Sequence, residues 1–201
     1  MAVWGEISIV SAPGMPLSEI GWAQVPSIAI LETIASSIKG IVMATAYYST
    51  VFQQPAASVW KIIRDFNNYA VWVGGVSDSA IEEGKSGDTV GAIRSVHYQG
   101  RHIRQRLLAL SDIERSQTYE FAGAPTLPVT GFKATLGVLE IVDGDGAFVQ
   151  WRADFDCEPE KREELCATLS LRFGQWLESL RRQMIRSGSK GLEQELAAVE
   201  G

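Results

Sequence analysis

Apolar and polar residues alternate along several short segments in the second half of the chain. The segment Ala147–Asp156 shows this most clearly, because every second side chain in it is apolar. A period of two places successive side chains on opposite faces of a strand, so the pattern predicts a half-buried β-strand. The residues that it turns toward the interior are Val149, Trp151, Ala153 and Phe155.

The same alternation, together with the turn residues between segments, predicts seven strands. Gln99-Gly100 suits a tight turn, and Asp143–Gly146 is the strongest hairpin signal in the chain. Alternation also turns inward Tyr119, Phe121, Phe132, Ala134, Leu136 and Val138. The predicted strands are Ile41–Phe52, Val76–Glu83, Gly91–Tyr98, Arg101–Ser111, Ser116–Ala122, Gly131–Val142 and Ala147–Asp156.

A helical period appears after the first predicted strand and again after the last. Apolar residues between Pro55 and Phe66 recur at helical spacing, and a second short helix is predicted over Tyr69–Val73. A long amphipathic helix is predicted from Pro159 to about Ser187, where Ser187–Gly191 suits a flexible stop. Its apolar stripe consists of Leu165, Leu169, Phe173, Trp176, Leu177, Leu180 and Met184.

These elements predict an α+β fold in which a curved, seven-stranded antiparallel sheet wraps around one long C-terminal helix. Such a sheet leaves a hollow beneath the helix, which we expect to hold a small, largely apolar molecule. Residues 41–187 form this domain, and residues 188–201 form a tail. Residues 1–40 form an extension with a short amphipathic helix, which either packs on its own domain or mediates a homodimer.

Composition excludes several other classes of protein. The net charge is −6 and no Lys/Arg run occurs, so we expect no nucleic-acid partner. No apolar run is long enough to predict a membrane span, and no signal peptide is evident, so a cytoplasmic location is expected. Two cysteines and two histidines do not form a metal-ligand pattern, and we expect neither a metal nor another cofactor.

The segments Gln54–Trp60 and Asp65–Tyr69, with Trp72, are close to the pattern "APAxxVW…DFxxYxxW". Val90–Val96 follows "VGxxRxV", and Gln105–Leu110 is close to "ERLLxxD". In these segments the chain resembles the polyketide cyclase/dehydrase family of the SRPBCC superfamily, which also holds START lipid-transfer domains, birch-pollen-type allergens and plant abscisic-acid receptors. The resemblance implies the helix-grip fold over about Ile41–Met184 and is poorly specific for activity.

The resemblance also implies polar residues in the hollow. By similarity to the plant receptors, Arg94, Val96 and Tyr98 would face the cavity, where Arg94 would bind a ligand oxygen unless it lies at the rim beside a local carboxylate. Tyr98 and Tyr119 are candidate donors, or two aromatic core residues. Gln105 stands where relatives often carry a carboxylate, so it can orient a ligand but cannot act as a base.

Aromatic and aliphatic side chains are expected to line the hollow, unless the rings fill the core and leave no cavity. We expect His97 on the outer face and His102 exposed, and we favour a solvated Arg172 over one that points into the groove. The predicted wall residues are Trp72, Val96, Leu107, Phe121, Phe132, Ala134, Leu136, Trp151, Leu169, Phe173 and Trp176.

Two functions are compatible with this interpretation. The first is a cofactor-independent cyclase or dehydratase of natural-product biosynthesis, a lyase or isomerase that binds a polyketide-, terpenoid- or aromatic-like molecule. Its catalysis would come from positioning and from Arg94, Tyr98, Tyr119 and Gln105 aimed at developing oxyanion charge. The alternative is a non-catalytic carrier or sensor of a lipid or small molecule, which needs only the apolar wall.

Overall fold

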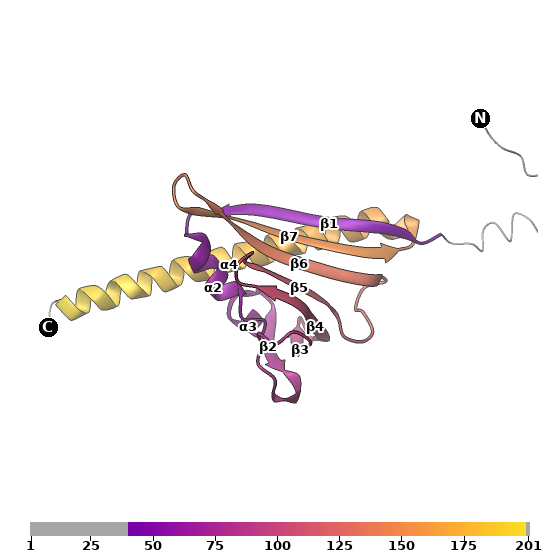
Figure 1. Cartoon of the computed structure of the whole chain (residues 1–201), viewed down its shortest axis with the longest axis horizontal. Coiled ribbons are helices and arrows are strands. Elements are labelled where there is room, and N and C mark those ends of the chain that lie inside the picture. Colours follow the sequence, from indigo (N-terminus) through magenta and orange to yellow (C-terminus); the bar gives the residue numbers. More distant parts are fainter. Residues whose placement is uncertain (1–39, 200–201) are drawn as a thin grey trace, which may run out of the picture. The chain divides into compact units, whose positions relative to one another are not determined.

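The computed structural model describes the backbone of residues 40–199 and the side chains of residues 40–188. Seven strands form one antiparallel sheet in the order β1-β7-β6-β5-β4-β3-β2. A long helix, α4, crosses this sheet (Figure 1). The predicted α+β helix-grip architecture is confirmed, whereas the predicted helix in residues 1–40 lies outside the described residues. The strands are β1 (Val42–Phe52), β2 (Val76–Ile81), β3 (Ile93–Tyr98), β4 (Arg101–Ser111), β5 (Ser116–Phe121), β6 (Thr130–Ile141) and β7 (Gly146–Cys157).

The helices follow the predicted order, and the structure corrects the predicted ends of one helix and one strand. Helices α2 (Ala56–Ile63) and α3 (Tyr69–Trp72) follow β1, and a 3-10 turn, η2 (Pro159–Lys161), precedes α4 (Arg162–Val199). The predicted stop at Ser187–Gly191 is wrong, because α4 continues through it. The predicted end of the second strand is also wrong, since residues Glu82–Gly84 form another 3-10 turn, η1, in which Glu83 has a φ of 59°.

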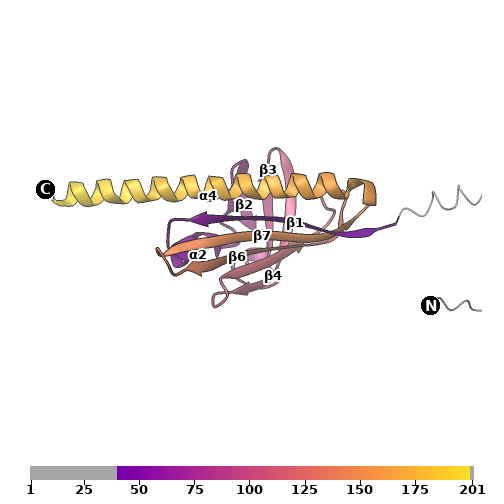
Figure 2. The same ribbon diagram turned by 90° about the horizontal axis from the view of Figure 1, so that it is seen from above.

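Strand β1 lies at the edge of the sheet, and α4 runs beside it (Figure 2). The helix satisfies part of this edge: the Tyr47 amide donates to Ser170 Oγ at 3.2 Å, and Arg181 Nη2 donates to the Val51 carbonyl at 2.9 Å. Gly174 permits the close approach, because a Cβ there would lie 2.9 Å from Tyr48 Cε2. These contacts cap an edge that would otherwise be free to pair with another strand.

The two faces of the sheet differ as the alternation predicts. Inward positions such as Ala44, Trp151 and Phe155 are buried against α4 and the short helices. Outward positions carry polar pairs instead, including Thr45 Oγ1 with Asp154 at 2.6 Å. One face is therefore apolar core and the other is solvated, which fixes the register of the sheet.

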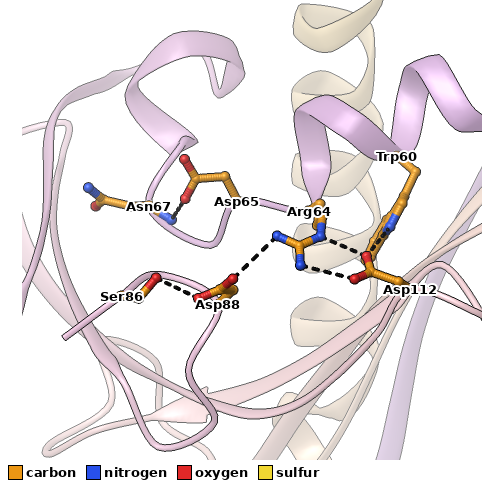
Figure 3. Close-up of polar contacts among 7 residues, drawn as sticks. All are labelled: Trp60, Arg64, Asp65, Asn67, Ser86, Asp88 and Asp112. Carbon is orange, nitrogen blue, oxygen red and sulfur yellow. Dashed lines mark hydrogen bonds and ion pairs between the residues drawn. The ribbon is translucent and has the colours of Figure 1, made fainter.

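A polar network fastens α2 and the residue after it to two loops (Figure 3). Arg64 binds both carboxylate oxygens of Asp112, at 2.7 and 2.9 Å, and Trp60 Nε1 donates to the same carboxylate at 2.9 Å. Arg64 also lies 3.5 Å from an Asp88 oxygen, and Asp88 accepts a hydrogen bond from Ser86. The network joins α2 to the β4–β5 turn and to the loop before β3.

Candidate ligand-binding cavity

Two small cavities lie between α4 and the inward-facing side chains of the sheet. The larger has a volume of about 60 Å³ and the smaller about 30 Å³. Both are lined by Tyr98, Ile103, Gln105 and Trp176, which stand between them. Ligand pockets commonly measure about 300–1,000 Å³, so these spaces fit a few water molecules or a small fragment of a ligand.

The cavities are small because aromatic rings fill most of the predicted hollow. Trp151 stacks on Phe173 with ring centroids 4.8 Å apart, and Tyr98 meets Trp176 edge to face at 5.5 Å. Of the predicted wall, Val96 borders the smaller cavity, and Phe121, Phe132, Leu169, Phe173 and Trp176 border the larger. The other predicted wall residues are buried in the core and border neither cavity: Trp72, Leu107, Ala134, Leu136 and Trp151.

Arg94 is fully buried and its side chain lies behind the cavity wall. Its Nε donates to Gln105 Oε1 at 2.9 Å, and its Nη1 donates to the Phe66 carbonyl at 2.7 Å. The guanidinium carbon lies 3.3 Å from the centre of the Tyr69 ring and 3.9 Å from that of Phe66. The guanidinium is therefore held by an amide, a carbonyl and aromatic faces.

The expected alternative of Arg94 at the cavity rim beside a carboxylate is wrong. Arg94 has no exposed surface and forms no ion pair within residues 40–188, and its Nη2 has no hydrogen-bond partner. Burial lowers the pKa of this guanidinium, an effect that the nearby Tyr69 and Tyr119 oppose. Arg94 borders neither cavity, so a ligand would reach it only if Gln105 or the two tyrosines moved.

Tyr119 borders the larger cavity. Its oxygen accepts a hydrogen bond from Trp151 Nε1 at 3.1 Å and lies 3.4 Å from the Tyr69 hydroxyl oxygen. The Tyr119 hydrogen can be donated to Tyr69 or to a ligand that enters the cavity. Burial raises the pKa of this phenol well above its usual value, so Tyr119 is a hydrogen-bond donor at neutral pH and not a base.

Other polar groups of the cavity wall are also donors. Trp176 borders both cavities, and its Nε1 is buried and has no partner within the described part of the chain. Gln105 uses its amide oxygen to accept from Arg94, which leaves its amide N–H groups for the cavity. No Asp, Glu or His among residues 40–188 borders either cavity. The wall is thus suited to a ligand that brings hydrogen-bond acceptors.

Two arginines that the sequence analysis did not place in the wall border the larger cavity. Arg101 on β4 is exposed, and Arg172 on α4 is half-buried, with its guanidinium carbon 5.7 Å from the centre of the Tyr98 ring. The favoured interpretation of a solvated Arg172 is therefore wrong. The sequence prediction of the wall missed Arg101. Alternation along β4 puts its side chain on the same face as Ile103 and Gln105, and this alternation would have placed Arg101 in the wall.

Phe121 and Phe132 separate the larger cavity from a depression on the surface. Their ring centroids are 4.5 Å apart, and both residues also border a surface hollow of about 300 Å³ beside the β5–β6 connection. Thr126 and Leu127 from that connection complete the inner cavity. The rings of Phe121 and Phe132 thus line both the surface hollow and the inner cavity.

The remaining candidate residues lie away from the cavities. His97 and His102 are exposed as expected, and the Ser95 hydroxyl lies 2.6 Å from His102 Nε2. Cys157 and Cys166 are free thiols, and burial raises the pKa of Cys157. In the described residues, no group of three His, Cys, Asp or Glu side chains is placed to hold a metal ion, and no helix there is long and apolar enough to cross a membrane.

Comparison with solved structures finds the same fold in bacterial and plant proteins. A crystal structure of an uncharacterized protein from Bacillus thuringiensis has 26% sequence identity and a TM-score of 0.62, over 71% of this chain and 99% of that one. A solution structure from Thermobifida fusca has 30% identity and a TM-score of 0.62, over 69% and 92%. A comparison with curated proteins gave no significant match.

A plant enzyme shares the fold at low sequence identity. A point mutant of norcoclaurine synthase from Thalictrum flavum, in complex with a transition state analogue, has a TM-score of 0.59 and 12% identity, over 74% of this chain and 98% of that one. At this identity the likeness concerns the fold alone. The family described as polyketide cyclase / dehydrase and lipid transport matches residues 43–184, which is most of the chain. The chain therefore belongs to the polyketide cyclase / dehydrase and lipid transport family, whose fold binds hydrophobic ligands.

Proposed function

We propose that this protein binds a small, largely apolar molecule that carries hydrogen-bond acceptors, with those acceptors placed in the cavity beneath α4. The observation that carries the proposal is the donor-rich wall, where Tyr119, Trp176 and Gln105 offer hydrogens and no carboxylate competes for them. A buried donor left without a partner costs about 1–3 kcal/mol. An acceptor that enters the cavity recovers that cost while the aromatic walls bury its apolar part.

Binding of a whole ligand requires the inner cavity to open, since its volume is about 60 Å³. We expect the cavity to open at the rings of Phe121 and Phe132, because these rings also border a surface hollow of about 300 Å³. Rotation of two aromatic side chains costs far less than unfolding a strand and would join the two spaces. A ligand would then place its acceptor end beside Tyr119 and its apolar body between the rings.

A cyclase or dehydratase activity is the second candidate, supported by the Tyr119 hydroxyl, which stays protonated at neutral pH and can donate to a ligand. Such a donor, with the Arg94 cation 5.1 Å behind the Tyr119 ring, would stabilise oxyanion charge that develops on a bound carbonyl. The described part of the wall supplies no ionisable base, however, because no Asp, Glu or His of residues 40–188 borders either cavity. The geometry therefore favours binding, with proton donation as the chemistry available to an enzyme.

Native mass spectrometry of the purified chain, before and after denaturing extraction, tests the binding proposal. A co-purifying small molecule released on denaturation would support it and would name the ligand class. The companion measurement is titration with the apolar dye N-phenyl-1-naphthylamine, followed by energy transfer from tryptophan. A chain that carries no molecule and takes up no dye would overturn the proposal in favour of a filled core.

Single substitutions distinguish the enzyme from the carrier once a ligand is known. For a donor used in turnover, Tyr119→Phe would lower kcat while the ligand affinity changes little. For a carrier, the same substitution would change affinity alone, and no turnover of the ligand would be detected. Tyr98→Phe is the matched comparison, since Tyr98 borders both cavities and tests whether the second phenol contributes.

A further inference from the structure

Arg101 and Arg172 bring positive charge to one cavity without a carboxylate to balance it. Arg101 comes from the sheet and Arg172 from α4, and both border the larger cavity. Neither arginine forms an ion pair within residues 40–188. If these cations served only to support the fold, we would expect each to contact a carboxylate. Two like charges at one small space repel each other, and a bound anion would relieve that repulsion.

The other arginines of β4 show that an ion pair is the ordinary state on this strand. Arg104 pairs with Glu82, and Arg106 pairs with Glu120 at 2.8 Å. Both lie on the outward face, whereas Arg101 has the inward phase of Gln105. The chain as a whole carries a net charge of −6, so carboxylates are abundant, and yet none in the described part of the chain borders this cavity. The unpaired cations are a local feature of the cavity and not a result of general basicity.

The surroundings of Arg172 favour a ligand that is aromatic or aliphatic next to its charged group. The guanidinium lies over the Tyr98 ring, and Leu169 and Phe173, its neighbours on the helix, are buried at the same cavity. Partial burial strengthens an ionic hydrogen bond relative to one in open water. The planar fork of arginine also matches the two oxygens of a carboxylate.

We propose that Arg101 and Arg172 bind the carboxylate of a small apolar acid whose body occupies the cavity beneath α4. The proposal rests on the proposed function, and it adds the chemical class of the ligand and the residues that select it. The carboxylate lies at the two guanidinium groups, where Arg101 remains in contact with solvent. The apolar part enters the cavity once the rings of Phe121 and Phe132 have moved and lies between them and Phe173, and any further acceptor on it meets Tyr119 or Gln105.

The test compares naphthalene-1-carboxylate with its neutral isostere naphthalene-1-carboxamide. The indole ¹⁵N–¹H resonance of Trp176, assigned by its absence in Trp176→Phe, reports binding at the cavity because this N–H is buried there. Titrations use the full chain as wild type, Arg101→Gln, Arg172→Gln and the double variant. Arg186→Gln is the matched control, since Arg186 is exposed on the same helix and borders neither cavity.

We expect the wild type to bind the acid about tenfold more tightly than the amide, with the preference decreasing in high salt. Each single variant should reduce that preference and the double variant should abolish it, while amide binding is retained and Arg186→Gln behaves as wild type. Equal affinity of wild type for both probes would overturn the carboxylate site and leave the proposed function standing. A preference that survives in the double variant would overturn the assignment to these arginines. Failure of both probes to shift Trp176 would overturn the proposed function together with this inference.

Discussion

The guanidinium carbon of Arg94 lies 3.3 Å from the centre of the Tyr69 ring, and the cation forms no direct ion pair within residues 40–188, although the charge of Asp65 also stabilises it. Hydrogen bonds to Gln105 and to the Phe66 carbonyl hold it in one orientation. Burying a cation without a direct ion pair is costly, and the hydrogen bonds of Nε and Nη1 and the aromatic faces offset part of that cost, while Nη2 has no partner within residues 40–188. Arg94 thus sets the position of Gln105 and Tyr69, two residues that border the cavities.

Replacing Arg94 with lysine should destabilise the fold although the charge is kept. Lysine cannot lie flat on the Tyr69 ring while it donates to Gln105 and to the Phe66 carbonyl, and its ammonium group is more strongly hydrated. We expect a loss of about 2 kcal/mol in the free energy of unfolding, measured by urea denaturation. Arg106→Lys on the exposed face of β4 is the control and should change stability by less than about 0.5 kcal/mol. Equal effects of the two substitutions would contradict this account of Arg94.

Removing the Tyr119 hydroxyl should leave a buried indole without its acceptor. Trp151 Nε1 donates to this oxygen at 3.1 Å and both side chains are almost fully buried. Tyr119→Phe is therefore expected to cost about 1–3 kcal/mol in the free energy of unfolding. The control is Tyr47→Phe, since the Tyr47 hydroxyl contacts Gln150 on the solvated face, and its loss should be nearly neutral. A neutral Tyr119→Phe would show that Trp151 finds another acceptor.

Opening the ring barrier should speed ligand entry. Phe121 is half-buried and packs on Phe132 between the surface hollow and the inner cavity. With Phe121→Ala we expect N-phenyl-1-naphthylamine to associate on the order of tenfold faster, because one of the two rings no longer has to rotate. Leu139→Ala, at a half-exposed position in β6, is the control and should leave the stopped-flow rate unchanged. An unchanged rate in both variants would place the entrance elsewhere.

The elements of the fold were predictable because they depend on local pattern. The alternation in β7 predicted which of its side chains are buried, and the turn residues Asp143–Gly146 predicted the hairpin that joins β6 to β7. The end of α4 was not predictable in this way. The glycines at 188 and 191 predicted that the helix ends there, because glycine is conformationally free and common at helix ends. The helix continues through both positions, so at this point the local preference was overridden.

The candidate site was less predictable because it depends on how side chains from distant strands pack. Six tryptophans permitted either an aromatic-lined hollow or a filled core, and only the stacking of Trp151 on Phe173 decides how much space remains. Arg172 illustrates the same limit. By its position on the helix, the Arg172 side chain could point either into the groove or into solvent. Its contact with the ring of Tyr98, a residue of β3, keeps it at the cavity.

The course of α4 beyond Ser187 can be tested at Gly188. A Cβ at this position would meet no atom within 4 Å, and the residue lies inside the helix. Gly188→Ala should therefore stabilise the helix locally by about 0.5–1 kcal/mol, seen as slower amide hydrogen exchange after residue 184. Gly100→Ala is the contrasting variant: its φ of +77° makes alanine strained, and we expect destabilisation. Unchanged exchange in Gly188→Ala would contradict a continuous helix.

The network around Asp112 predicts how stability depends on pH in acid. Arg64 hydrogen bonds lower the pKa of the Asp112 carboxyl most, and the Trp60 indole lowers it further. A carboxyl whose pKa is lower in the folded state contributes stability that is complete above the unfolded pKa, about 3.9, and is lost as the pH falls through the folded pKa. The stability difference between wild type and Asp112→Asn should then be constant from neutral pH to about pH 5 and decrease below about pH 4.

Urea denaturation of both chains between pH 3 and pH 7 measures this difference directly. Asp143→Asn is the matched control, because Asp143 is exposed in the turn between β6 and β7 and forms no ion pair in the part of the chain that the structure describes. Its difference from wild type should be small at every pH. High salt should weaken the Asp112 effect only in part, because its carboxylate receives three directed hydrogen bonds in addition to the charge of Arg64. An Asp112→Asn difference that is the same at pH 3 and pH 7 would mean that the carboxyl group gains nothing from its partners on folding.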